Sequence, residues 1–220
     1  MNDQPSLTDL NAAAEAEWLE RWTAGPTEGE GAGLPTGAPA PGLSLVDDHG
    51  DVRSLSEFWV DGPALLMFWR HFGCSGGAER AARLVAEWSQ YQDAGLNPVI
   101  ISQGEPERAA AYRAKHALPA PVLSDPDHTA YRAYGVGHWP VERVLFDAPE
   151  RMWTHSREEG EKFLANRREQ GRPPVDDPWR AAAEFVVGTN GLVRLTYYYQ
   201  HCEDFPDARV LTTAARLSAG

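Results

Sequence analysis

The sequence is poor in cysteine, in positive charge and in long apolar runs. Its 220 residues contain two cysteines, and 20 Lys and Arg stand against 32 Asp and Glu. So few cations argue against a phosphate-binding face and against a polybasic membrane patch, because both depend on clustered Lys and Arg. We therefore expect neither nucleic acid nor a membrane among the partners. The longest apolar run, Ala64–Trp69, is far shorter than the roughly 20 residues that span a bilayer.

The N-terminal residues 1–5 are polar and acidic, unlike the start of a secretory signal peptide, so we expect a cytoplasmic location. In a reducing compartment two cysteines do not form a disulfide scaffold. Each is then a buried thiol, a metal ligand or a reactive group. A zinc site needs three or four converging ligands, and beyond the cysteines only seven scattered histidines are available. No glycine-rich nucleotide motif is present either, and we expect no metal and no other cofactor.

The first 33 residues differ in composition from the rest. Residues 7–22 are rich in alanine and carry a partial apolar stripe, which predicts a helix that Gly25-Pro26 ends. Residues 27–41 are dense in glycine, proline and small side chains, as in a linker. We expect the helix to dock on the main domain, with a dimer arm as the alternative. The predicted boundaries are 1–33 for helix and linker and 34–220 for the main domain.

Short apolar strands alternate with helices in the main domain. Strands are predicted at residues 43–46, 52–55, 64–69, 97–102, 121–124, 184–187 and 192–200, and helices at 78–91, 106–116, 127–134 and 207–217. This alternation indicates an α/β sheet with parallel pairs, and Asn190-Gly191 marks a closing antiparallel hairpin.

Residues 137–179 interrupt the alternation before the final hairpin. They hold Trp139, Trp153 and Trp179 and contain one charged stretch, residues 157–170, that predicts a helix. Connections this long are usually functional lids or excursions with a helix of their own. We interpret the segment as an insertion into the main domain.

Cys74 lies where a predicted buried strand ends and a helix begins. The N–H groups and the dipole of a helix N-terminus lower the pKa of a thiol there. Arg70 and His71 lie just upstream, and a cation near the sulfur acts in the same direction. The glycines around Cys74 are expected to leave its sulfur unshielded. Such a thiolate attacks peroxides and disulfides. The alternative is a small buried apolar residue, with Arg70 and His71 in structural roles.

Five blocks of sequence follow one another along the chain, at residues 39–58, 65–74, 99–106, 121–135 and 185–191. The second leads from the apolar strand through Arg70 to Cys74, and the last contains the turn at Asn190-Gly191. Together they resemble thioredoxin-like redoxins of the AhpC/TSA (peroxiredoxin) superfamily, over about residues 34–217. The resemblance implies a thioredoxin-like α/β fold with a central mixed sheet and flanking helices. To this the chain adds an N-terminal helical arm and a long insertion before the final hairpin.

The resemblance also implies a thiol-dependent antioxidant enzyme, a peroxiredoxin-like oxidoreductase of cell redox homeostasis. Cys74 would be its single peroxidatic-type cysteine, and Arg70 would stabilise the thiolate. Arg180 is a loose counterpart of the family's second arginine. The substrate would be a hydroperoxide or a disulfide, the reductant an external thiol similar to thioredoxin or glutathione. A homodimer is compatible with the sequence.

Three positions depart from the family pattern. Gly77 stands where a Cys-x-x-Cys motif has its second cysteine, so no local disulfide can form. Met67 and His71 stand at the proline and threonine positions of the peroxiredoxin motif, and His71 is the candidate substitute for the threonine that orients the peroxide. These departures support a contrasting class, a non-catalytic thioredoxin-like binding or regulatory protein that uses the insertion as a partner surface. A thiol reductase that forms a mixed disulfide with glutathione is a third interpretation.

Cys202 follows the last predicted strand and is the only other cysteine. A sulfenic acid at Cys74 has to be reduced by a thiol, and Cys202 is the internal candidate. We expect one or two strands between the cysteines, about 10 Å, which exceeds the roughly 7 Å Cα limit for a disulfide without movement. Glu203 and Asp204 are expected to raise the pKa of the Cys202 thiol. A resolving cysteine and a structural residue at a strand end both stay open.

Overall fold

The computed structural model describes residues 6–145 and 154–217, and within these ranges seven strands form one mixed sheet. Their order is β2-β1-β5-β4-β3-β6-β7. The three central strands β5, β4 and β3 are parallel, and antiparallel pairs extend the sheet on both sides. The bounds are β1 Ser44–Asp47, β2 Val52–Ser54, β3 Ala64–Phe68, β4 Asn97–Ser102, β5 Val122–Ser124, β6 Ala183–Val187 and β7 Val193–Tyr198. The predicted central mixed sheet is confirmed.

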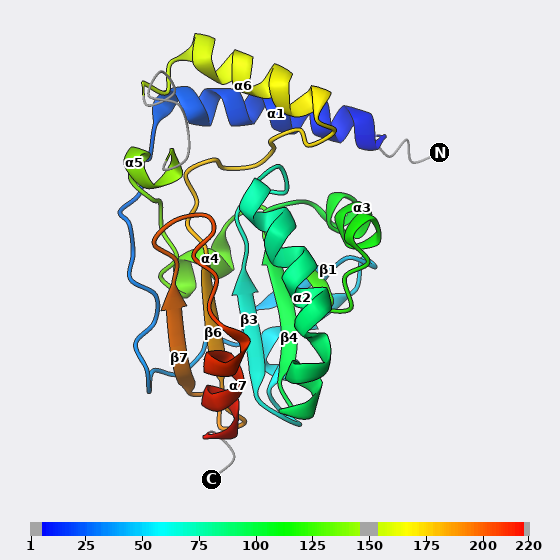
Figure 1. The fold of residues 1–220 in the computed structure, drawn as a ribbon, viewed down its shortest axis with the longest axis vertical. Helices are drawn as coiled ribbons and strands as arrows, with labels where there is room; N and C mark the ends of the chain where they lie inside the picture. Colours follow the sequence, from blue (N-terminus) through cyan, green and yellow to red (C-terminus); the bar gives the residue numbers. More distant parts are fainter. Residues whose placement is uncertain (1–5, 146–153, 218–220) are drawn as a thin grey trace.

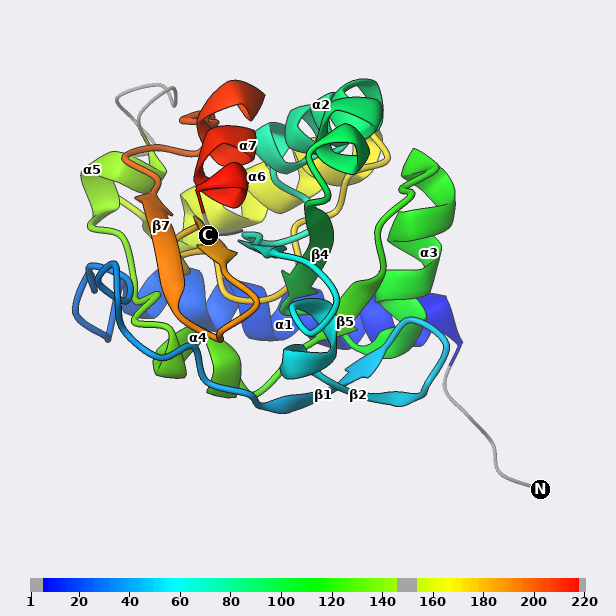
Figure 2. The ribbon, with the colours of Figure 1, turned by 90° about the horizontal axis from the view of Figure 1, so that it is seen from below.

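Helices cover both faces of the sheet and one of its ends. They are α1 Leu7–Ala24, η1 Leu55–Phe58, α2 Ser75–Asp93, α3 Pro106–His116, α4 Thr129–Ala133, α5 Val141–Val144, α6 Arg157–Glu169 and α7 Ala208–Arg216. Figures 1 and 2 show α2 and α7 on one face and α4 on the other. In the part of the chain that the structure describes, no helix is long and apolar enough to cross a membrane.

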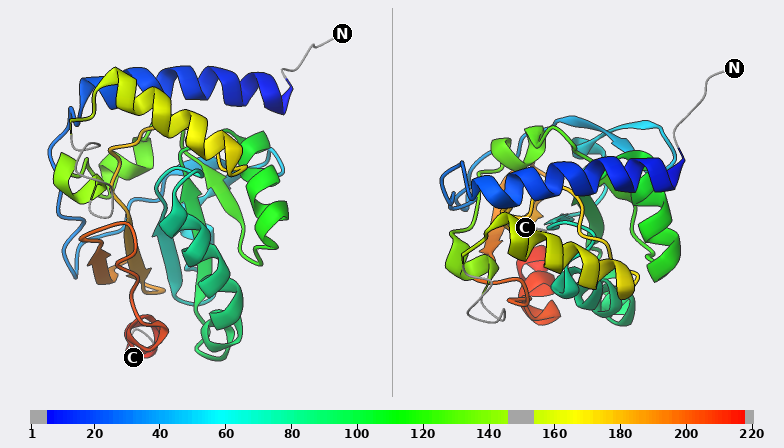
Figure 3. Two further views of the ribbon diagram at one scale, coloured as in Figure 1. Left: turned by 45° about the horizontal axis from the view of Figure 1, so that its top comes forward. Right: turned by 90° about the horizontal axis from the view of Figure 1, so that it is seen from above.

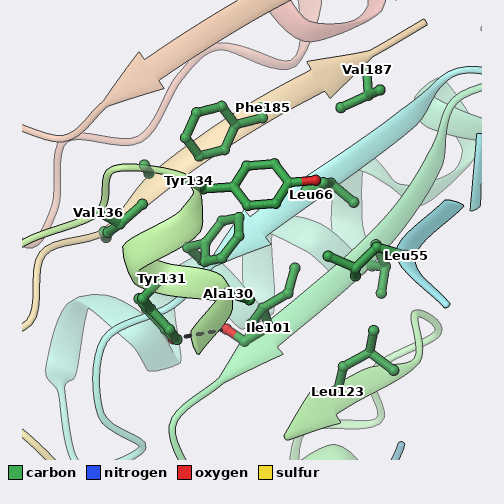
Figure 4. Packing of buried hydrophobic residues seen from close by; sticks show 14 of the residues in the cluster. Leu55, Leu66, Ile101, Leu123, Ala130, Tyr131, Tyr134, Val136, Phe185 and Val187 are labelled. Atoms are coloured by element: carbon green, nitrogen blue, oxygen red, sulfur yellow. Dashed lines mark hydrogen bonds between the residues drawn. The ribbon is translucent and has the colours of Figure 1, made fainter. Parts of the chain in front are cut away.

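The core has two layers, because side chains alternate along the buried strands. On β3, Leu65 and Met67 pack with α2, α3 and α7, whereas Leu66 and Phe68 pack with α4. Figure 4 shows the second layer, where Phe185 and Tyr134 lie together. The Phe68 ring is 5.0 Å from Tyr134 and 5.5 Å from Phe185. A strand covered on both faces needs apolar side chains throughout, which explains the continuous run at Ala64–Trp69.

Most predicted element boundaries differ from the observed ones by one or two residues, and two of the differences have clear local reasons. α2 begins at Ser75 instead of residue 78, with Cys74 as its N-cap, so the glycines after Cys74 lie in the first helical turn. Residue 55 was predicted to end a strand but begins η1. There the Ser54 side chain and the carboxylate of Glu57 form a capping box, which favours a helical turn.

α1 docks on the chain beside α6 of the insertion, and the pair lies across the end of the sheet where β3 and β4 finish (Figures 1 and 3). Aromatic rings join the two helices, because Phe163 of α6 lies 5.7 Å from Trp18 and 6.0 Å from Trp22 of α1. Trp22 also stacks at 5.1 Å on Trp179, which lies between α6 and β6. The docking that the sequence favours is therefore the one observed. Residues 1–5 and residues 146–153 of the insertion, including Trp153, lie outside the described residues. The boundary between residues 33 and 34 stays a prediction.

Candidate active site

Cys74 lies at the junction of β3 and α2 and is 5% exposed. Its backbone N–H donates to the carbonyl of His71 at 3.0 Å, which closes a tight turn before the helix. The glycines nearby do not expose the sulfur as expected, because they admit other chain segments. A Cβ at Gly73 would lie 2.5 Å from the Cα of Pro174, and one at Gly76 would lie 2.1 Å from the carbonyl oxygen of Cys202.

Arg70 supplies a positive charge directly to the sulfur. One of its guanidinium nitrogens, Nη1, lies 3.4 Å from the Cys74 Sγ. The carbonyls of Pro178 and Arg180 accept from its other nitrogens, and its guanidinium lies over the Trp139 ring at 5.1 Å. Among the described residues no carboxylate lies within ion-pair distance of Arg70, so its charge acts on Cys74. The sequence-based expectation that Arg70 faces this cysteine matches the geometry.

Cys202 and Cys74 line one cavity, and their side chains interact through a hydrogen bond. One strand, β6, lies between β3 and β7, as expected, but the expectation that this keeps the two cysteines apart is wrong, because the chain turns back after β7 and passes over the first turn of α2. Gly76 makes the approach possible, since any side chain there would collide with the backbone of Cys202. Both cysteines are free thiols in the structure.

The pKa values of the two thiols move in opposite directions. A hydrogen bond from Cys202 holds the pKa of Cys74 well below its ordinary value, and the Arg70 charge and the N–H of Gly77 act in the same direction. Burial opposes them. The pKa of Cys202 is raised, mainly by its hydrogen bond to Cys74, by burial and by the Cys74 charge. Glu203 adds to this rise, while Asp204 accepts from Tyr197 and from the N–H of Gln200. Cys74 is thus the thiolate and Cys202 the proton donor.

His71 is buried and faces the same space as Cys74. Burial lowers its pKa to about 3, with the Arg70 charge acting in the same direction, so its imidazole is neutral at physiological pH. Its Nδ1 has no hydrogen-bond partner among the described residues. A neutral imidazole carries one N–H donor and one acceptor, which suits a peroxide that offers both.

The guanidinium of Arg180 does not reach the site. It donates to Glu28 at 2.6 Å and to the carbonyl of Val136 at 3.1 Å, and lies 3.7 Å from Asp177. Its backbone carbonyl accepts from Arg70 at 3.2 Å. Arg180, predicted to be catalytic, therefore has a structural role in this geometry. Its side chain bonds to Glu28 of the linker and to the carbonyl of Val136, and its own carbonyl orients Arg70.

A cavity of about 480 Å³ opens above the two cysteines. α1 and α6 roof it, and its aromatic wall comes from Trp18, Trp22 and Phe163. Sequence reasoning missed these residues. The sequence predicted the two helices α1 and α6 separately, but nothing in it indicated that they pack against each other. Trp139 and Trp179 of the insertion are buried inside the chain, which leaves them unavailable for the partner surface that was considered.

No group of three His, Cys, Asp or Glu side chains in the described residues is arranged to hold a metal ion. The site consists of two sulfurs, one arginine, one neutral histidine and a helix N-terminus.

Curated relatives match about half of the chain. Thioredoxin-like protein AAED1, chloroplastic, from Arabidopsis thaliana is 29% identical over 109 residues, which is 50% of this chain and 44% of the relative. Peroxiredoxin Bcp from Escherichia coli strain K12 is 29% identical over 103 residues, which is 47% of this chain and 65% of the relative. The match thus spans less than two thirds of either relative.

Solved structures with this fold include peroxidoxin BcpB from Mycobacterium tuberculosis and peroxiredoxin Q from Xanthomonas campestris. The first has a TM-score of 0.61 at 17% identity and covers 85% of this chain and 99% of its own. The second has a TM-score of 0.57 at 14% identity and covers 87% and 100%. These similarities establish the thioredoxin-like fold. The model of the AhpC/TSA family matches residues 36–195, well over half of the sequence, and the chain belongs to that family.

Proposed function

We propose that this protein is a thiol peroxidase that reduces hydroperoxides with Cys74 and resolves the oxidised cysteine with Cys202. The observation that carries the proposal is the placement of both cysteines in one cavity, with the Cys202 segment packed on the first turn of α2. The pKa of Cys74 is lowered there and that of Cys202 is raised. A thiolate beside a thiol is the arrangement that a peroxide-driven disulfide requires.

In the first step the Cys74 thiolate attacks the terminal oxygen of the hydroperoxide. The S–O bond forms as the O–O bond breaks, so sulfur is oxidised to a sulfenic acid and the peroxide is reduced. The alkoxide takes a proton from water and leaves as the alcohol. Arg70 stabilises the charge that moves from sulfur to oxygen, and the neutral ring of His71 takes the orienting role.

In the second step the sulfur of Cys202 attacks that of Cys74. The S–S bond forms, the S–O bond breaks, and the hydroxyl leaves as water with the Cys202 proton. The raised pKa of Cys202 does not block this step, because much of the rise comes from Cys74 itself. Oxidation removes the negative charge on Cys74, so Cys202 ionises more readily once the sulfenic acid has formed.

The third step returns the enzyme to its reduced state. An external thiol attacks the disulfide to give a mixed disulfide, and a second thiol releases it, so two thiols are oxidised to one disulfide. Relatives described as peroxiredoxins support a hydroperoxide substrate and a thiol reductant for this chain, and hence a role in redox homeostasis.

The test compares three proteins under single-turnover conditions with a sulfenic-acid trap. The wild-type protein is expected to consume one equivalent of hydroperoxide and to lose both thiols. Cys202→Ser is expected to consume the same amount but to keep a trappable sulfenic acid, because its resolving sulfur is gone. Cys74→Ser is expected to be inert. Unchanged consumption in Cys74→Ser would overturn the proposal.

A further inference from the structure

The cavity above Cys74 is much larger than the peroxide group that would react there. Its volume of about 480 Å³ falls in the range of sites for small organic molecules. Trp18, Trp22 and Phe163 form a stacked wall, with Phe163 5.7 Å from Trp18 and 6.0 Å from Trp22. Trp18 and Trp22 are buried beneath this stack, so the accessible ring surface is that of the partly buried Phe163, and the cavity has room for more than the reacting atoms.

Arg167 of α6 brings a positive charge to the same cavity. Its guanidinium lies over the Phe163 ring at 5.1 Å, and Nη1 donates to the side-chain oxygen of Gln170 at 3.2 Å. Glu159 and Glu203 also line the cavity, but among the described residues no carboxylate lies within ion-pair distance of Arg167. Its neighbours on the helix differ, because Lys162 pairs with Glu158 at 2.8 Å and Arg168 pairs with Glu15.

The surroundings of Arg167 disfavour its charge. Partial burial lowers its pKa, and the nearby charge of Arg172 acts in the same direction, while the negative charges of Cys74 and Cys202 act against them. A guanidinium nevertheless stays protonated in proteins, so this charge persists without a carboxylate to balance it. The charge does not serve mainly to activate Cys74, whose pKa depends more on Cys202, Arg70 and the N–H of Gly77. Besides the Cys74 thiolate, which acts on Arg167 through its charge, a bound carboxylate would supply the direct ion pair that Arg167 lacks among the described residues.

We propose that Arg167 binds the carboxylate of a small organic co-substrate whose apolar body packs on the partly buried side chains of Phe163 and Val144. The reacting group of that molecule then reaches Cys74 at the floor of the cavity. This inference rests on the proposed function for the identity of the reacting group. Two sources share the recognised chemistry: an organic hydroperoxide that bears a carboxylate, which would act in the oxidation step, and a carboxylate-bearing thiol, which would act in the reduction step.

The first experiment measures binding without turnover. Para-isopropylbenzoate, which has neither a peroxide nor a thiol, is titrated into the reduced protein at fixed ionic strength, and tryptophan fluorescence reports on the ring wall. Arg167→Gln is expected to raise the Kd about tenfold or more, as loss of a charge-assisted hydrogen bond does. Arg172→Gln is the matched control, because it removes the same charge from a residue that does not line this cavity. An equal Kd in wild type and Arg167→Gln, or equal weakening in both variants, would overturn the inference.

The second experiment distinguishes the two sources. In the oxidation arm, kcat/KM for para-carboxycumene hydroperoxide is compared with that for neutral cumene hydroperoxide. In the reduction arm, mercaptopropionate is compared with mercaptoethanol on the oxidised protein. If the wild-type protein prefers the carboxylate-bearing compound in one arm and Arg167→Gln loses this preference, the inference is supported. The arm that shows the preference then identifies the step in which the carboxylate is bound. A preference that survives in Arg167→Gln, or none in either arm, contradicts it. Absence of any hydroperoxide turnover would overturn the proposed function instead, and the binding experiment would still decide the role of Arg167.

Discussion

At the scale of single residues, burial and hydrogen bonding act on Cys74 in opposite directions. Burial raises the pKa of a thiol, and Cys74 is almost inaccessible to solvent. The hydrogen bond from Cys202 and the charge of Arg70 outweigh burial, and the pKa falls. The site therefore stabilises a thiolate in an environment that would otherwise keep it protonated. Arg70 is central to this balance, because its guanidinium contacts the sulfur and carries no carboxylate partner within the described residues.

Arg70→Met is expected to slow alkylation of Cys74 by about tenfold or more at pH 7, because it removes a charge-assisted hydrogen bond. Because the pKa of wild-type Cys74 is lowered, its alkylation rate should hold to a lower pH than that of the variant before it falls. The variant should already lose rate as the pH drops below the ordinary cysteine pKa of about 8.5. Rate–pH profiles with iodoacetamide measure this. Superimposable profiles would show that Arg70 does not set the ionisation.

At the scale of elements, the first turn of α2 has to accommodate the segment after β7. Gly76 and Gly77 are neighbours there, but only one of them faces Cys202. A Cβ at Gly76 would meet the Cys202 carbonyl at 2.1 Å, whereas the nearest atom to a Cβ at Gly77 is the Cys74 Cβ at 3.7 Å, an ordinary contact. The two glycines offer a matched pair of substitutions.

Gly76→Ala is expected to push Cys202 away from Cys74 and to slow disulfide formation at least tenfold, since the clash is with backbone and cannot be relieved by a rotamer change. Gly77→Ala should resolve at the wild-type rate and gain up to about 1 kcal/mol of stability from helix propensity. The measurement is the lifetime of the sulfenic acid after a peroxide pulse. Equal lifetimes in the two variants would contradict the geometry.

The pairing of α1 with α6 depends on a third glycine. A Cβ at Gly160 would lie 2.6 Å from Cδ1 of Trp22 and 2.8 Å from Cδ1 of Leu19. Gly160→Val is therefore expected to force the helices apart, cost about 1–3 kcal/mol of stability and speed the reaction of Cys74 with a bulky maleimide. Gly29→Ala is the control, because no atom lies within 4 Å of its added Cβ. Chemical denaturation and maleimide kinetics on both variants check this, and unchanged kinetics in Gly160→Val would show that the pair does not restrict access.

At the scale of the whole molecule, the net charge of −12 sets the long-range field. Anionic small molecules are repelled at a distance, but this repulsion is screened beyond about 10 Å at ordinary salt. Inside the cavity the charges are mixed, because Arg70, Lys162 and Arg167 line it together with Glu159 and Glu203. The long-range field and these local charges therefore act over different ranges, and a partner thiol must approach a mostly anionic exterior.

The sheet was predictable from sequence because its signals are local. Continuous apolar runs predicted β3 and β4. Glu105-Pro106 predicted the start of α3, which spans the predicted residues 106–116. The position of Cys202 was not predictable, because it depends on a turn after β7 and on the empty space at Gly76. The cavity roof was also missed, since Trp18 and Phe163 are far apart in the sequence and meet only through tertiary packing.

The central claim is that Cys74 and Cys202 of one chain form a disulfide when Cys74 reduces a hydroperoxide. The direct measurement is peptide mapping of the reduced protein after one equivalent of hydroperoxide, with the products first separated by size. The structure predicts a disulfide between Cys74 and Cys202 within a monomer and no remaining free thiol. Two free thiols after the peroxide has been consumed, or a disulfide found only between chains, would contradict it.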